Sequence, residues 1–299
     1  MTYRNCLAGV VISILSVVCV APAFAGPQPP AGWTDGYVFA NGIRIHYWRT
    51  GANTSKPPLV LAHGSSDDGL CWTNLAREIQ DGYDIIMFDA RGHGLSDPPT
   101  PSDPADVQVE DLAGLIRELK LVRPILMGHS MGSRSVAQFA AKYPDVPRAV
   151  ILEDPGLVPP APGATPTPHP SVDERRATIL SRNNTPDATL VAGCMKSSPK
   201  WGQSECEFWA PSKRRHHPAT ASIATGGRAP MSEVFVKITA PTLILKADAQ
   251  GDLRKQNEDV ASRLRKGKLV HITGAGHNVR RENKAMTLEV LRAFLSTTC

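Results

Sequence analysis

The sequence predicts an α/β fold: a doubly wound, mostly parallel eight-stranded sheet with a helical lid inserted after the sixth strand. Two observations support this prediction. Short apolar runs alternate with helix-length segments along most of the chain, and one proline-rich stretch interrupts the alternation before it resumes. Strands that alternate with helices of this size form parallel sheets that are covered on both faces.

The first two strands are expected to form a hairpin. Residues 37–40 and 43–48 flank Asn41-Gly42, and Asn-Gly between alternating apolar residues indicates a tight turn. The later strands are continuous apolar runs, as is typical of strands buried on both faces. They cover residues 59–62, 84–88, 125–127, 149–152, 241–247 and 268–271. Helices are expected over residues 72–81, 107–119, 131–142 and 280–295.

The alternation stops after Asp154. Residues 155–170 contain seven prolines, a density that helix and strand interiors do not tolerate. Helical pieces follow, and the sheet pattern resumes at residue 241. We therefore expect one domain over 26–299, interrupted by a lid insertion at about 155–235.

The first 25 residues have the pattern of a signal peptide. Arg4 precedes an apolar run over 7–20, and Ala23-Phe24-Ala25 is a small-residue cleavage site. This pattern predicts cleavage after Ala25 and a periplasmic or secreted protein. A membrane anchor is the alternative, but the run is shorter than the ~20 residues that a span needs, so we expect no stable membrane span.

Composition and charge narrow the class of protein. The 299-residue chain is 41% hydrophobic and 20% charged, as in globular proteins with a large core. Its net charge of +5 is not gathered into one stripe, so no nucleic-acid partner is expected. Cys194 and Cys206 can form a local disulfide in an exported chain, Cys71 is expected to be a buried thiol, and no cysteine spacing indicates a metal site.

Gly128-His-Ser130-Met-Gly132 fits the pattern Gly-x-Ser-x-Gly. An apolar strand precedes it and an alanine-rich helix follows, which is the sharp strand-to-helix turn that exposes a nucleophilic serine. The helix N-terminus also favours the negative charge that develops during attack. Ser130 is therefore the predicted nucleophile.

A serine hydroxyl needs a base, and Gly274-Ala-Gly-His277 places a histidine in a glycine-flanked loop after the last strand. We expect His277 to be that base, because the other histidines lie in strands, in loops nearer the N-terminus or in the predicted lid. The loop His63-Gly64-Ser65 follows the third strand. The backbone N–H groups of Ser65 and Met131 are the expected oxyanion hole.

These features resemble the α/β-hydrolase superfamily over about 36–296. The chain is most similar to bacterial, esterase-like serine hydrolases that carry four further runs: His63-Gly64, 68–72 (DGLCW), 89–94 (DARGHG) and 275–281 (AGHNVRR). The resemblance implies a Ser-His-Asp triad in that chain order. It also implies that Asp89 and Arg91 tie loops together and do not react.

The acid of the triad has more than one candidate. The resemblance places it after the strand at 241–247, where Asp248 follows directly and Gln250 takes the usual position. Some superfamily members carry the acid after the preceding strand, which is Asp154 here. Glu153 and Asp252 are further alternatives. Whichever carboxylate serves must accept the imidazole N–H and stabilise the imidazolium.

Three tryptophans, Trp72, Trp201 and Trp209, are candidates for lining an acyl pocket, although such residues are often core. The basic cluster 213–217 is either a solvated lid surface or an attractor of anionic substrates. We expect an exported serine hydrolase that cleaves a small carboxylic ester or lactone without a cofactor or metal. Alternatives on the same triad are C–C bond hydrolysis, amide hydrolysis and cofactor-free perhydrolysis, and one of another class is a non-catalytic ligand-binding protein.

Overall fold

The computed structural model describes residues 27–52, 55–158, 170–223 and 229–298. Its centre is one eight-stranded sheet in the order β1-β2-β4-β3-β5-β6-β7-β8, which confirms the predicted fold class. The strands are β1 (Thr34–Ala40), β2 (Ile43–Arg49), β3 (Pro58–Ala62), β4 (Asp84–Phe88), β5 (Ile125–His129), β6 (Ala149–Glu153), β7 (Thr242–Ala247) and β8 (Gly267–Ile272).

The pairing of the strands is parallel from β4 to β8, and only β1 with β2 and β2 with β4 are antiparallel. The predicted hairpin is present: Asn41 and Gly42 join β1 to β2 with φ values of +48° and +78°. These left-handed conformations explain the Asn-Gly pair, because other residues adopt them at a cost.

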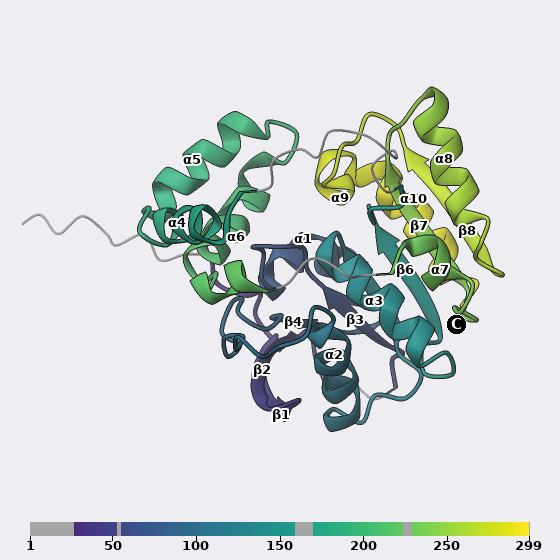
Figure 1. Ribbon diagram of the computed structural model, residues 1–299, viewed down its shortest axis with the longest axis horizontal. Coiled ribbons are helices and arrows are strands. Elements are labelled where there is room, and N and C mark those ends of the chain that lie inside the picture. Colours follow the sequence, from purple (N-terminus) through teal and green to yellow (C-terminus); the bar gives the residue numbers. More distant parts are fainter. Residues whose placement is uncertain (1–26, 53–54, 159–169, 224–228, 299) are drawn as a thin grey trace, which may run out of the picture.

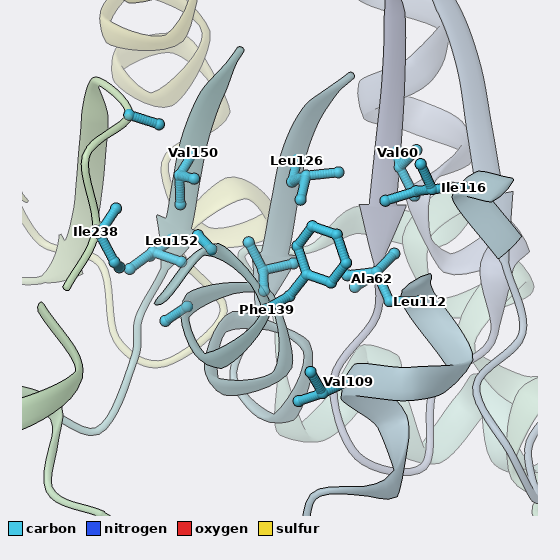
Figure 2. Packing of buried hydrophobic residues seen from close by; sticks show 14 of the residues in the cluster. Val60, Ala62, Val109, Leu112, Ile116, Leu126, Phe139, Val150, Leu152 and Ile238 are labelled. Carbon is cyan, nitrogen blue, oxygen red and sulfur yellow. The ribbon is translucent and has the colours of Figure 1, made fainter. Parts of the chain in front are cut away.

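Helices cover both faces of the sheet. On one face, α2 (Val107–Glu118) and α3 (Met131–Lys142) pack on alternate strand residues, and Phe139 of α3 belongs to the same buried cluster as Ala62, Leu112 and Leu126 (Figure 2). The other face is covered by α1 (Thr73–Ile79), α9 (Val279–Glu282) and α10 (Lys284–Leu295). Because side chains alternate along a strand, each continuous apolar run supplies both cores.

The last predicted helix is divided in two. Asn283 has an extended backbone, with φ of −140°, and its side-chain oxygen accepts a hydrogen bond from the backbone N–H of Met286. This N-cap begins α10 afresh after α9, so the single helix expected over 280–295 is corrected to two.

A group of helices lies between β6 and β7. It contains α4 (Val172–Asn183), α5 (Asp187–Ser197), α6 (Gly202–Arg214), the short 3-10 helix η2 (Pro218–Ser222) and α7 (Met231–Phe235). Figure 1 shows α4, α5 and α6 gathered at one side of the molecule, whereas α7 lies beside α3 (Figure 1). The disulfide that the sequence left open is present, because Cys194 of α5 is bonded to Cys206 of α6.

Three further predictions concern the signal peptide, membrane spans and Cys71. The predicted signal peptide, residues 1–25, lies outside the described residues. Among the helices of the described ranges, none has the length and apolar character needed to cross a membrane. Cys71 is a buried free thiol in the 3-10 helix η1 (Gly69–Trp72), as expected.

Candidate active site

Ser130 occupies the turn between β5 and α3. Its backbone adopts φ +52° and ψ −109°, a conformation that non-glycine residues rarely take and that marks a constrained turn. The backbone N–H of Ser130 donates to the carbonyl of Glu153 at the end of β6 (3.0 Å). The turn is therefore fixed to the neighbouring strand, and the side chain stands at the carboxyl edge of the sheet.

The two glycines of the pattern are required by close packing of backbone. A Cβ on Gly128 would lie 2.3 Å from the carbonyl oxygen of Gly132, and one on Gly132 would lie 2.2 Å from that of Ala62. Backbone atoms cannot move aside as a side-chain tip can, so only glycine lets β5, β3 and α3 approach this closely.

His277 lies in the loop after β8 and reaches Ser130. Its Nε2 is 2.9 Å from the Ser130 Oγ, and its Nδ1 is 2.5 Å from Oδ2 of Asp154. His129 supports the loop, because its Nε2 donates to the carbonyl of His277 (3.0 Å). The hydrogen bond to Asp154 raises the pKa of His277 above its ordinary value, although partial burial opposes this. The three side chains thus form one hydrogen-bonded line.

Asp154 follows β6 and is 7% exposed. Its Oδ1 accepts the backbone N–H of Ala247 (3.0 Å) and forms an ion pair with Lys246 of β7. Burial acts to raise the pKa of the Asp154 carboxyl, but its bonds to His277, Lys246 and Ala247 outweigh burial and hold the pKa below the ordinary value. Asp154 is therefore an ionised acceptor for the imidazole at neutral pH.

Asp248 does not take this place, and its interpretation as the acid is corrected. The His277 Nδ1 is bonded to Asp154, whereas Asp248 is exposed and its Oδ2 accepts the backbone N–H of Gly274 (2.8 Å). Asp248 thus holds the turn that leads to His277. Glu153 is also excluded as the acid, because it is buried and paired with Arg280 (2.8 Å).

The expected oxyanion residues flank Ser130: Met131 is the next residue, and Ser65 follows Gly64, on which a Cβ would lie 3.5 Å from the Ser130 Cβ. Ser65 follows β3, and Met131 is the first residue of α3, where backbone N–H groups have no partner within the helix. His63 stabilises the loop of Ser65 by two hydrogen bonds. Its Nδ1 donates to the carbonyl of Gly64 (2.8 Å), and its Nε2 accepts the N–H of Ala90 (2.9 Å).

Met131 lines two cavities. One, of about 330 Å³, is lined by Ser130, Asp154 and His277 among others. The other, of about 430 Å³, borders Ser65 and Met131 and extends beneath α4 and η2 of the insertion. We call the second one the distal cavity.

The three tryptophans do not line these cavities. Trp72 is fully buried in the core under the guanidinium of Arg280, which lies 3.9 Å from the ring centroid. Its assignment to substrate binding is wrong, because no face of the ring is free. Trp201 and Trp209 lie edge to face, 6.4 Å apart, and neither is among the described residues that line either cavity. Their predicted role in the pocket is likewise corrected.

A buried ionic cluster was not predicted. The Lys213 Nζ of α6 donates to Asp67 (2.6 Å) and to the carbonyl of Ser66 (2.7 Å). Arg281 binds the other oxygen of Asp67 (3.0 Å) and also Glu205 of α6 (3.1 Å). Lys213 is 1% exposed, so the view of 213–217 as a solvated surface is wrong at this residue. The cluster fastens the insertion to the loop behind Ser65.

Comparison with known proteins places this geometry in a family. The model of the alpha/beta hydrolase family matches residues 59–287. A 2-(acetamidomethylene)succinate hydrolase of Mesorhizobium japonicum is 40% identical over 100 residues, which are 33% of this chain and 36% of that protein. The match thus spans about a third of that relative's length.

Solved structures show the same fold over a larger share of the chain. An enol-lactonase from Burkholderia xenovorans superposes with a TM-score of 0.66, at 18% identity, over 87% of this chain and all of the other. An esterase from Rhodococcus gives 0.68, at 20% identity, over 90% of this chain and all of the other. Together with the matching family model, the doubly wound sheet and the Ser130 turn show that the chain belongs to the α/β-hydrolase family.

Proposed function

We propose that this protein is a serine hydrolase that cleaves a carboxylic ester or lactone through an acyl-enzyme intermediate. The observation that carries the proposal is the line from the Ser130 Oγ through His277 to Asp154, with separations of 2.9 and 2.5 Å. Nucleophile, base and orienting carboxylate in this order are what acyl transfer by serine requires. Two structural neighbours are named as an esterase and an enol-lactonase, which agrees with this class of reaction.

In the first step, the Ser130 Oγ attacks the substrate carbonyl while His277 Nε2 takes the hydroxyl proton. Asp154 stabilises the imidazolium that forms. The carbonyl oxygen becomes an oxyanion that accepts hydrogen bonds from the backbone N–H groups of Ser65 and Met131. When the tetrahedral intermediate collapses, His277 returns the proton to the departing alkoxide, which leaves as the alcohol.

In the second step, a water molecule attacks the acyl-enzyme. His277 accepts a proton from the water, the second tetrahedral intermediate collapses, and the proton passes to the Ser130 Oγ as the acid is released. Every proton that leaves a nucleophile therefore goes to His277 and returns to a leaving group. The ionised Asp154, held by Lys246 and Ala247, keeps the same orientation throughout.

We also propose that the mature protein is exported to the periplasm or secreted. The pattern of residues 1–25 supports this, and so does the Cys194–Cys206 disulfide, because such bonds persist in oxidising compartments. N-terminal sequencing of protein recovered outside the cytoplasm should begin at Gly26. Recovery with an intact Met1 would contradict the proposal.

A fluorophosphonate probe and a short-chain nitrophenyl ester test the enzymatic proposal together. The probe should label Ser130, as mapped by peptide mass spectrometry, and labelling should abolish turnover of the ester. Ser130→Ala is the matched control and should give neither signal. If the wild-type protein is neither labelled nor active on any ester or lactone offered, a non-catalytic ligand-binding role replaces this proposal.

A further inference from the structure

The distal cavity begins where the proposed oxyanion residues lie. Its walls include Ser65 and Met131, and it lies between α2 and the insertion helices α4 and η2. Its volume is about 430 Å³. Met131 also borders the cavity that contains Ser130. Met131 is thus a lining residue that the two cavities share.

Two guanidinium groups stand at that end. Arg175 and Arg182 both line the distal cavity from α4. They are seven residues apart, or two helical turns, and so lie on the same face of the helix. No aspartate or glutamate occurs among the described residues that line the cavity. The wall against α4 is therefore cationic.

Arg175 is half-buried and Arg182 is exposed, and both differ in their partners from the fully buried arginines of the protein. Arg91, Arg280 and Arg281 each pair with a buried carboxylate. Within the described ranges, no carboxylate forms an ion pair with Arg175 or Arg182. Arg175 donates instead to the carbonyl oxygens of Pro170 and Ala221. Those bonds fix the position of its guanidinium and leave its positive charge without a counter-charge.

The imidazoles beside the cavity do not add charge at neutral pH. His93 and His216 stack with ring centroids 4.5 Å apart, and both line the distal cavity. Burial, together with the nearby cations Lys213 and Arg182, lowers the pKa of His216 to about 4. Burial likewise keeps the pKa of His93 well below its ordinary value. The arginines thus supply the positive charge of this wall.

We infer that an acyl chain whose carbonyl lies at Ser130 extends past Met131 into the distal cavity, and that this cavity binds a carboxylate at the far end of the chain. The substrates would then be esters or lactones whose acyl part carries a second, free carboxylate, and hydrolysis would release a dicarboxylic acid. Arginine suits this task, because its planar fork of N–H donors matches a carboxylate in two parallel hydrogen bonds. The inference rests on the proposed function for the reaction, but the binding of the carboxylate can be tested without it.

The first experiment compares two esters that differ at the far end only, monomethyl adipate and methyl hexanoate. Wild-type protein should have the higher kcat/KM for monomethyl adipate. Arg182→Gln and Arg175→Gln should each lower the ratio of the two kcat/KM values by roughly 10- to 100-fold, as expected for a lost hydrogen-bonded charge pair. Arg176→Gln is the matched control, because Arg176 lies on the same helix but contacts Asp173 and Ser222 outside the cavity. It should leave the ratio unchanged.

The second experiment measures binding alone, by calorimetry on the Ser130→Ala protein. Succinate, adipate or suberate should bind more tightly than the monocarboxylate of the same length, and Arg182→Gln should remove that advantage. If none of the three dicarboxylates binds more tightly than its matched monoacid, or if Arg176→Gln weakens binding as much as Arg182→Gln, the inference is overturned. Failure of the proposed function would look different: Ser130 would stay unlabelled and esters intact, whatever the dicarboxylates do.

Discussion

The carboxyl edge of the sheet and the helical insertion hold their functional side chains in different ways. At the sheet edge, Ser130 and Asp154 each follow directly on a strand, adopt positive φ values of +52° and +43°, and are fixed by backbone hydrogen bonds. The insertion is held to the sheet by long side chains, through the ion pairs of Lys213 with Asp67 and of Glu205 with Arg281. The difference separates a rigid reaction centre from the segment that, by our inference, selects the substrate.

Removal of the proposed base, His277, should have the largest effect on activity. His277→Ala should lower kcat by on the order of 10⁶-fold, because a triad acts as a unit and the loss of one member removes most of its effect. The loss should appear in steady-state ester hydrolysis with the thermal midpoint nearly unchanged, since His277 is exposed. A variant that keeps more than about a hundredth of the wild-type kcat would exclude His277 as the base.

The attachment of the insertion can be broken at Lys213. Lys213→Met leaves the buried Asp67 with Arg281 alone, and breaking a buried ion pair costs about 3–5 kcal/mol. Urea unfolding should show this loss of stability. Arg117→Met is the control, since Arg117 pairs with Glu118 at the surface and such pairs contribute little. Equal stability of the two variants would show that the cluster does not fasten the insertion.

The disulfide offers a milder perturbation of the same region. It joins α5 to α6 over a sequence separation of 12. Replacing both Cys194 and Cys206 with alanine should cost about 2–3 kcal/mol, as estimated for a loop of that size. Differential scanning calorimetry of the double variant would measure the cost. Addition of reductant to the wild-type protein should cause the same loss of stability. Addition of reductant to the double variant should leave its stability unchanged.

The pH dependence of kcat/KM tests the electrostatics of the sheet edge. His277 must be neutral to accept a proton, and Asp154 raises the pKa of His277 above its ordinary value of 6.5. Activity should therefore fall as the pH drops through a value above 6.5. Lys246→Met removes a cation that opposes protonation of His277, so it should move this acid limb to higher pH. An acid limb that moves to lower pH would contradict the assigned effect of Lys246.

Much of this architecture follows from local sequence patterns. The strands are continuous apolar runs, Gly128 and Gly132 frame the Ser130 turn, and Gly274 and Gly276 flank the loop of His277. Each signal lies within a few residues of the feature it predicts. The Cys194–Cys206 bond also joins residues close in sequence, which made it predictable.

The features that the sequence did not predict depend on pairs far apart along the chain. Asp154 and Asp248 both follow a strand, and only the positions of Lys246 and His277 decide between them. Trp72 is a core residue because Arg280 covers it, and Lys213 is buried because Asp67 and Ser66 lie opposite. One useful signal was present: a lysine near the carboxyl end of an otherwise apolar strand, such as Lys246 in β7, indicates a buried or half-buried carboxylate nearby.

The identity of the triad acid is the most direct test of the account. Asp154→Asn and Asp248→Asn should be assayed side by side for kcat on one ester. The account predicts a loss of about 10⁴-fold for Asp154→Asn, because the amide no longer selects the reactive tautomer or stabilises the imidazolium, and near wild-type kcat for Asp248→Asn. A large loss confined to Asp248→Asn, or full activity in both variants, would contradict it.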